Sequence, residues 1–191
     1  NSFGSINDLY NGFILLSAKN LSAKNTDIQQ TKSNFVGSRL EYRNPLNNIF
    51  FNVSYNFNDR TSNITYLNKL NVDSQQFILE GYNLENNSKT NSARTELGKY
   101  FPKLKTNASV GYNYSLSNYQ QLPANSTPTE SSFIDVEGRN QGVSVKFNNN
   151  YFSWLSVDYN ANWSFSKTQS PDDARFNNKT NSFNHALSAY V

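Results

Sequence analysis

Several strand-length segments of this chain alternate apolar and polar side chains with a strict period of two. In the segment 107–117, every even position from Ala108 to Leu116 is aliphatic or aromatic, and the odd positions are Asn, Ser or Gly. The segment 155–166 repeats the pattern, with apolar residues at odd positions and Asn, Ser or Asp at even ones. Because side chains alternate across a strand, these segments predict strands with one apolar face and one polar face.

The composition is unusual for a water-soluble domain. Hydrophobic residues make up 36% of the chain and aromatic residues 15%, and the mean hydropathy is −0.71. A soluble domain is usually about 45–50% apolar. Asn and Ser together account for roughly 30% of this chain, which exceeds their ordinary usage. Disordered chains lack regularly spaced aromatic residues, so the sequence predicts an ordered all-β structure.

Charge and cysteine content exclude several classes of function. The formal net charge is +3, and Lys and Arg are scattered without a basic stripe, so no nucleic-acid partner is expected. The absence of Cys excludes a disulfide scaffold and a thiolate metal site. No apolar run approaches the ~20 residues that a membrane helix requires. The chain begins at Asn1 and is still alternating at its end, so we expect 1–191 to be a single segment of a longer domain.

Turn signals predict an antiparallel up-and-down meander of about eight long strands. Tight turns are predicted at 44–48, 100–105 and 148–152, where Pro and Asn supply the backbone angles that such turns need. Longer polar connections are predicted at about 20–32, 59–63 or 83–90, 120–131 and 169–178. The strands are then expected at 8–18, 33–43, 49–58, 91–101, 105–119, 132–148, 153–168 and 179–191.

Two regions depart from this simple pattern. The alternation within 61–84 predicts a hairpin arm that extends the third and fourth strands. Between Val136 and Val143 the apolar positions change parity, and Gly138 and Gly142 lie in this interval. A β-bulge is therefore predicted there.

Strand length and aromatic placement favour lipid as the cover of the apolar face. A strand of ~10 residues tilted by ~45° spans roughly the 25 Å apolar band of an outer membrane, whereas sandwich strands are shorter. Aromatic residues flank the predicted tight turns, where membrane barrels carry aromatic girdles. These residues are Tyr42, Phe50, Phe51, Tyr100, Phe101, Tyr151, Phe152 and Trp154. The sequence therefore predicts that the chain forms part of a transmembrane β-barrel.

The polar face suits a water-filled or plug-contacting interior, because short neutral side chains there can hydrogen-bond across strands. Charged residues on the strands are expected on this polar parity, so that none faces lipid. The predicted lumen-facing residues are Asn56, Arg94, Glu96, Asn113, Lys146, Asp158, Asn160 and Asn162. The predicted lipid-facing residues are Val53, Tyr55, Phe57, Val110, Tyr112, Tyr114, Leu116, Val157, Tyr159, Trp163 and Phe165.

The blocks EYRNPLNNIFFNVSYNF, GKYFPKLKTNASVGYNYSLSNYQQL and NNYFSWLSVDYNANWSFSKTQ, with the ending NSFNHALSAYV, resemble the barrel region of TonB-dependent receptors and related large outer-membrane barrels. The resemblance covers most of 33–191 and rests on texture rather than on an invariant motif. It implies a bacterial outer membrane location in a Gram-negative cell, in the wall of a barrel of about 22 strands that imports a bulky solute. The implied partners are outer-membrane lipid, the rest of the barrel, a plug domain with TonB, and a surface lipoprotein. The plug and the TonB box are missing from this sequence, which favours barrel wall over active transporter.

The sequence leaves a second class of function open and gives little support to a third. A soluble or cell-surface β-sandwich binding module, such as an adhesin or a glycan-binding domain, would use exposed aromatic residues to stack on sugars and would need no detergent. An enzyme is not expected, because the sequence contains no nucleophile elbow, phosphate loop or zinc motif. His185 is predicted to be a strand-face residue, and Asp172 and Asp173 a solvated turn, so no cofactor or metal is expected.

Overall fold

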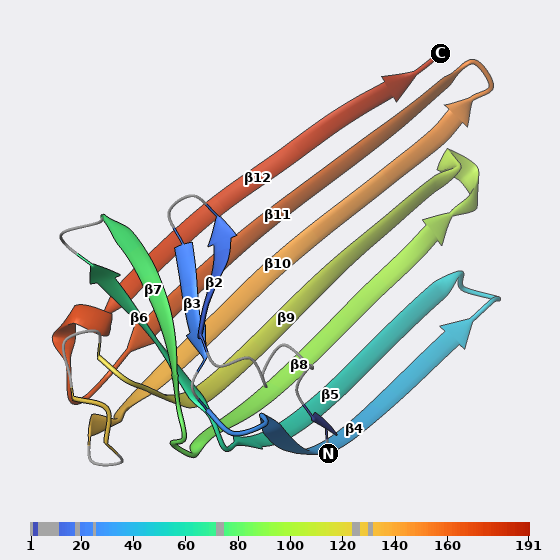
Figure 1. Ribbon diagram of the computed structural model, residues 1–191. Helices are drawn as coiled ribbons and strands as arrows, with labels where there is room; N and C mark the ends of the chain where they lie inside the picture. Colours follow the sequence, from blue (N-terminus) through green and yellow to red (C-terminus); the bar gives the residue numbers. More distant parts are fainter. Residues whose placement is uncertain are drawn as a thin grey trace.

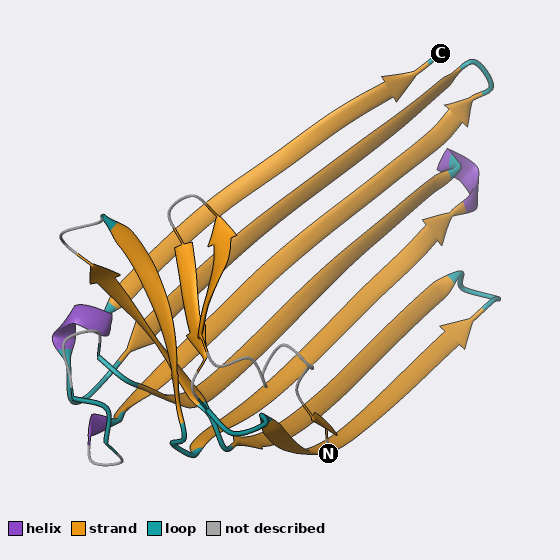
Figure 2. Cartoon of the chain, viewed as in Figure 1, coloured by secondary structure: helices purple, strands orange, loops and turns teal. Residues whose placement is uncertain are grey.

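The computed structural model describes residues 2–3, 12–17, 20–24, 26–71, 75–123, 127–129 and 132–191. The fold is all-β, as predicted (Figures 1 and 2). The described residues form two sheets. The large sheet has eight strands in the order β1-β4-β5-β8-β9-β10-β11-β12, and the small sheet has four in the order β2-β3-β7-β6.

The large sheet is an antiparallel meander of seven long strands with a two-residue strand at one edge. Within the part of the chain that the structure describes, β12 pairs only with β11, so the sheet is not closed into a barrel. Its strands are β1 (Ser2–Phe3), β4 (Gln30–Asn44), β5 (Ile49–Ser62), β8 (Asn86–Phe101), β9 (Thr106–Gln121), β10 (Ile134–Phe152), β11 (Leu155–Gln169) and β12 (Asn178–Tyr190).

Three short connections lie together at one end of the large sheet, which we call the turn end (Figure 1). In the first, the Asn44 side chain accepts hydrogen bonds from two backbone N–H groups of the turn, and Asn48 adopts a φ of 53°. In the second, a 3-10 turn over Pro102–Leu104 ends at Lys105 with a φ of 45°. Asn tolerates this left-handed conformation better than most residues, which explains its place in the first turn.

The third tight turn lies at 153–154, and its predicted position at 148–152 was wrong. β10 stays paired with β11 as far as Asn149, and after a register shift Phe152 pairs with Leu155. The backbone hydrogen bonds of this ladder extend the strand beyond the Asn run that suggested the turn.

The small sheet stands over the other end of the large sheet, which we call the loop end (Figure 1). β2 pairs antiparallel with β3, β3 runs parallel to β7, and β6 and β7 form a hairpin. Its strands are β2 (Gly12–Ser17), β3 (Asn20–Lys24), β6 (Thr65–Asn71) and β7 (Gln76–Tyr82).

The small sheet corrects three predictions. The expected first meander strand at 8–18 was wrong, because its described part is β2 of the small sheet. The connection expected at 20–32 contains β3 and the start of β4. The hairpin within 61–84 is confirmed, but it leaves the large sheet after Ser62, where Ser62, Ile64 and Thr65 are buried.

The β-bulge predicted in β10 is absent, because β10 pairs with β9 without interruption from Ile134 to Asn149. Ile134 and Val136 therefore point to the opposite face from Val143. Val136 is only 1% exposed, and Ile134 is 9% exposed. The apolar parity changes because a different face is covered at the loop end, while the register stays the same.

Most of the apolar core lies at the loop end. Of the six apolar side chains that are buried among the described residues, all except Ala161 belong to β6, to the start of β10 or to the connections at the loop end. They are Ile64, Leu67, Leu122, Ile134 and Val136. Hydrophobic burial is therefore concentrated at the loop end, where the small sheet stands, and Ile134 and Val136 contribute to it from the polar face.

We expect Ile64→Ala to destabilise the packing of the small sheet by about 2–5 kcal/mol, because it leaves a cavity in this core. Hydrogen exchange of the β6 and β7 amides measures the loss. Leu46→Ala is the matched control: Leu46 is 92% exposed at the turn end, and the change should stay within about 0.5 kcal/mol. Equal protection in the two variants would contradict a core at the loop end.

Candidate functional site

The register of the large sheet defines two faces. Paired residues of neighbouring antiparallel strands point to the same side, so a row of partners can be followed across the sheet. One such row contains Leu40, Val53, Thr95, Tyr112, Val143, Trp163 and Phe183. Every predicted lipid-facing residue lies on the face of this row, the apolar face, and every predicted lumen-facing residue lies on the other, the polar face.

The apolar face carries a mostly apolar band without Asp, Glu, Lys or Arg, which we call the apolar band, and its polar members are Ser38, Thr95 and His185. On each strand the band consists of alternate residues counted from the first of a range. These ranges are 36–42, 49–57, 93–97, 108–116, 143–147, 155–165 and 183–189.

The apolar band is exposed along the sheet. Val110 is 51% exposed, Trp163 52% and Leu187 68%. The small sheet lies on the polar face, so no second layer among the described residues covers the band. An exposed apolar surface that extends over seven neighbouring strands marks a surface that meets a partner or a membrane.

The apolar band crosses the strands obliquely. On the loop-end side, the last band residue is Val36 on β4 and Phe183 on β12. The row that contains Phe183 reaches β4 at Leu40, four residues away from Val36. The limit therefore shifts by four residues, about 13 Å, across six strand spacings, about 29 Å. The strands are thus inclined by about 25° to the band, and the ladder 108–116 spans about 24 Å of its height.

Two aromatic side chains near the loop-end limit of the apolar band donate hydrogen bonds to Asn side chains. The Tyr55 hydroxyl donates to Asn91 Oδ1 at 2.7 Å, and Trp163 Nε1 donates to Asn181 Oδ1. Both acceptors lie one rung beyond the donor on the neighbouring strand. Asn181 lies beyond the band on β12, so the polar tip of Trp163 points out of the band, as amphipathic aromatics do at a boundary between apolar and wet surroundings. Asn91, in contrast, lies between Phe57 and Leu116 of the band.

Aromatic residues also gather at the turn end, as the sequence predicted. The rings of Tyr151 and Phe152 meet edge to face with centroids 5.1 Å apart, and the Phe152 ring lies 5.6 Å from that of Trp154. All three side chains are at least half exposed. Phe50 and Tyr100 also flank turns, but their register places them on the polar face.

The expectation that strand charges avoid the apolar face holds within the apolar band and was wrong beyond it. Lys99 lies on the apolar face at the turn end, and Lys89, Arg139 and Lys167 lie on it at the loop end. Side chains continue to alternate between the two faces beyond the ends of the band. The apolar surroundings end with the band, so charged residues occur on the same face beyond it.

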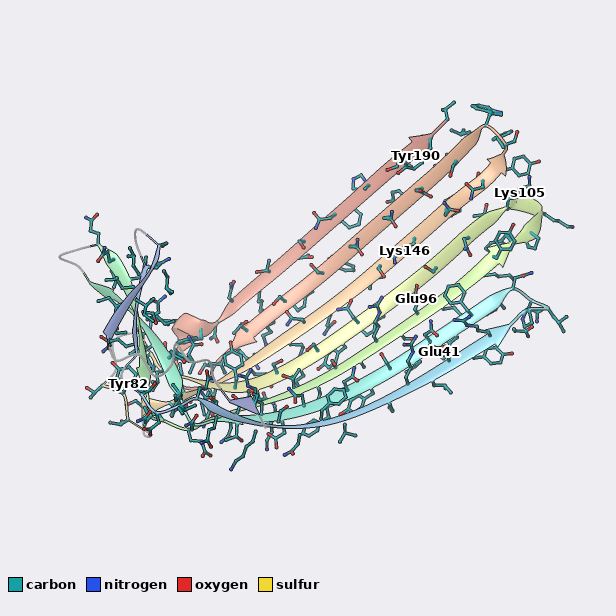
Figure 3. The ribbon with its side chains drawn as sticks, turned by 45° about the vertical axis from the view of Figure 1, so that its right-hand side comes forward. Glu41, Tyr82, Glu96, Lys105, Lys146 and Tyr190 are labelled. Atoms are coloured by element: carbon teal, nitrogen blue, oxygen red, sulfur yellow. The ribbon has the colours of Figure 1, made fainter. Side chains whose placement is uncertain are left out.

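The polar face carries Asn, Ser and Thr with interspersed ion pairs. Figure 3 labels Glu41, Glu96 and Lys146, which come from three strands of this face. Arg39 pairs with Glu41, and a hollow of about 320 Å³ lies between Arg39, Arg94 and Glu96. The polar face can therefore hydrogen-bond a polar solute or another polar segment of protein.

Glycines of the large sheet all lie on the polar face. A Cβ atom at Gly98 would lie 2.0 Å from the Phe50 ring, and one at Gly142 would lie 2.5 Å from Asn113 Oδ1. At Gly138, in contrast, the nearest atoms would be 3.9 Å away. Glycine thus makes room for larger neighbours on the polar face at some positions and not at others.

A second hollow, of about 660 Å³, lies at the loop end. Its lining includes Lys89, Tyr119, Asp135, Glu137 and several amide side chains. The Ser170 hydroxyl donates to the Asp135 carbonyl at 2.7 Å and fixes the loop after β11 to the start of β10. The sequence did not single out this hollow, because its lining comes from four strands and one loop.

Lys69, Glu80 and Tyr82 form a polar cluster on the β6–β7 hairpin. Lys69 Nζ donates to Glu80 Oε2 at 2.8 Å and to the Tyr82 hydroxyl at 2.7 Å, and that hydroxyl donates to Glu80. The hydrogen bond from Lys69 lowers the pKa of Glu80, and the same bond raises the pKa of Lys69. Burial is the main reason that the pKa of Tyr82 is raised.

The structure also shows the surroundings of the acidic turn at 172–173 and of His185, where the sequence predicts no metal site. The Asp173 carboxylate accepts three hydrogen bonds from the Arg175 side chain, which lower its pKa. His185 lies on the apolar face, with its ring stacked at 5.5 Å from that of Phe183. Among the described residues, no group of three or more His, Cys, Asp or Glu side chains could hold a metal ion.

Comparisons of the chain with protein-family models, with curated proteins and with solved structures gave no match. The described residues contain no helix that is long and apolar enough to cross a bilayer.

We expect Gly98→Ala to lower the free energy of unfolding by about 1–3 kcal/mol, because the added methyl group collides with the Phe50 ring. Denaturant unfolding in lipid vesicles measures the change. The same substitution should cost less in a Phe50→Ala background, and Gly138→Ala should be tolerated. A cost that is unchanged without the ring would refute the collision.

The hairpin cluster predicts a stability step in acid. Because the folded pKa of Glu80 lies below its usual value of 4.5, its contribution is complete above that pH and is lost as the pH falls through the lowered pKa. Thermal unfolding followed against pH should show this loss in the parent chain and not in Glu80→Gln. An identical acid dependence in both proteins would assign the step to other carboxylates.

Proposed function

We propose that this chain forms part of the wall of a bacterial outer-membrane β-barrel, with the apolar face toward lipid and the polar face toward the lumen. The observation that carries the proposal is the exposed apolar band without Asp, Glu, Lys or Arg. Its height on β9, about 24 Å over 108–116, matches the roughly 25 Å apolar belt of outer-membrane barrels. The inclination of about 25° is shallower than the 35–45° of complete barrels.

The ends of the apolar band support the same orientation. Trp163 directs its indole N–H to Asn181, just beyond the band on β12, and the turn end carries an exposed aromatic cluster. Short turns at one end and longer connections at the other also agree with barrels that have short periplasmic turns and longer outer loops.

The polar face supports passage of a polar solute. Its Asn and Ser side chains are too small to fill the core of a narrow barrel, which favours a wider parent barrel. The resemblance of the strand–turn–strand blocks to TonB-dependent receptors makes an importer of that class our specific proposal, with the plug, TonB and a surface lipoprotein as proposed partners.

The alternative of a soluble sandwich module requires a second sheet over the apolar face. The described small sheet lies on the polar face, and Val110, Tyr112 and Trp163 remain 40–52% exposed. These exposures favour lipid as the cover.

We expect Val110→Arg to reduce membrane assembly strongly, because an Arg near mid-bilayer costs about 2–4 kcal/mol. Folding yield into liposomes, read as the fraction protected from protease, measures the effect. Asn113→Arg is the matched control, since it lies three residues along the same strand on the polar face and should fold with near-parental yield. Equal yields for the two variants would refute the orientation.

A further inference from the structure

Three cations lie side by side on the apolar face of the large sheet. Arg139 of β10 pairs with Lys167 of β11, and Lys167 pairs with Lys179 of β12. We call these three residues the basic row. Neighbouring strands are about 4.8 Å apart, and like charges placed directly opposite each other destabilise a sheet. An anion bound between the three cations would therefore relieve their mutual repulsion.

The described residues supply little compensation for the basic row. Arg139 Nη2 donates to Glu137 Oε1 at 3.5 Å, and that oxygen also accepts from Gln169 at 3.0 Å. Arg139 Nε is buried and has no hydrogen-bond partner. Among the described residues, no ion pair or side-chain hydrogen bond joins Lys167 or Lys179 to another residue.

The basic row lies close to the loop-end limit of the apolar band. Phe165 is the last band residue on β11, and Lys167 is the next residue on that face. On β10 and β12 the band ends at Val143 and Phe183, and one polar rung separates it from the basic row. Long basic side chains lay their stems along apolar surface and keep their charge at its edge, so the row lies at headgroup level.

An additional donor faces the same place. The rung between Phe183 and Lys179 is Asn181, whose carbonyl oxygen accepts the hydrogen bond from Trp163 Nε1. Its amide N–H groups are therefore directed elsewhere and can donate to a bound anion. A guanidinium, two ammonium groups and an amide make a strong set of donors for phosphate oxygens.

We propose that the basic row binds the phosphate of an anionic lipid headgroup in the leaflet at the loop end. The inference rests on the proposed function, because only a lipid-facing apolar band brings headgroups to this height. Charge complementarity selects the anionic lipid over zwitterionic ones, and the position at the edge of the band selects a lipid over an anion free in solution.

The test uses the full chain with Trp154→Phe, so that Trp163 is the only tryptophan, reconstituted in phosphatidylcholine vesicles that contain phosphatidylglycerol. Bromine is placed on the acyl chains of one lipid or the other, and quenching of Trp163 reports which lipid lies beside it. We expect phosphatidylglycerol to quench preferentially. In Lys167→Gln and Lys179→Gln, that preference should fall by about fivefold for each cation removed.

The controls separate lipid binding from other effects. Lys167→Arg keeps the charge and should keep the preference, and Lys99→Gln, on the same face at the turn end, should leave it unchanged. Inorganic phosphate should not reduce the preference, and displacement by it would overturn the assignment to lipid. Equal quenching by both lipids in the parent chain would overturn this inference alone, whereas quenching by neither would overturn the proposed function as well.

Discussion

The unbroken antiparallel register from β4 to β12 is the constraint on which the large sheet depends. Because each pair of neighbouring strands keeps its partners on one side, the two-residue alternation of a single strand is carried across all seven long strands. A slip of one residue in any pairing would exchange the faces of every strand beyond it. Both the apolar band and the basic row beyond it follow from this continuity.

The surroundings of each face change along the length of the strands, whereas the strand register stays constant. On the polar face, Val136 is buried near the small sheet, while Asn113 and Asn162, farther along the strands, are exposed. On the apolar face, Val143 belongs to the apolar band, while Arg139 lies on the same side of the same strand beyond it. The sheet thus combines a locally dry core at the loop end with an exposed apolar belt in its middle.

The proposed wall function and the proposed lipid site depend on the same boundary. On β10 to β12 the apolar band stops at Val143, Phe165 and Phe183, next to the hydrogen bond from Trp163 to Asn181, and the basic row follows within one or two rungs. The oblique course of the band brings this boundary closest to the turn end on β10 to β12, which is where the cations lie. At the level of the basic row, β4 and β5 carry the apolar residues Val36 and Phe57 instead of cations.

Sequence alone determined the all-β class, most of the long strands and the division of the site residues between two faces, because a period of two is a local property of each strand. It misjudged β10, since the change of parity at Val136 reflects a cover supplied by segments far away in the chain. Tertiary structure alone decided that β2 and β3 join the β6–β7 hairpin in a separate sheet. It also decided that Arg139, Lys167 and Lys179, which are up to 40 residues apart in the sequence, form one row. Strand pairing sets such neighbours, and alternation within one strand carries no information about which strand lies beside it.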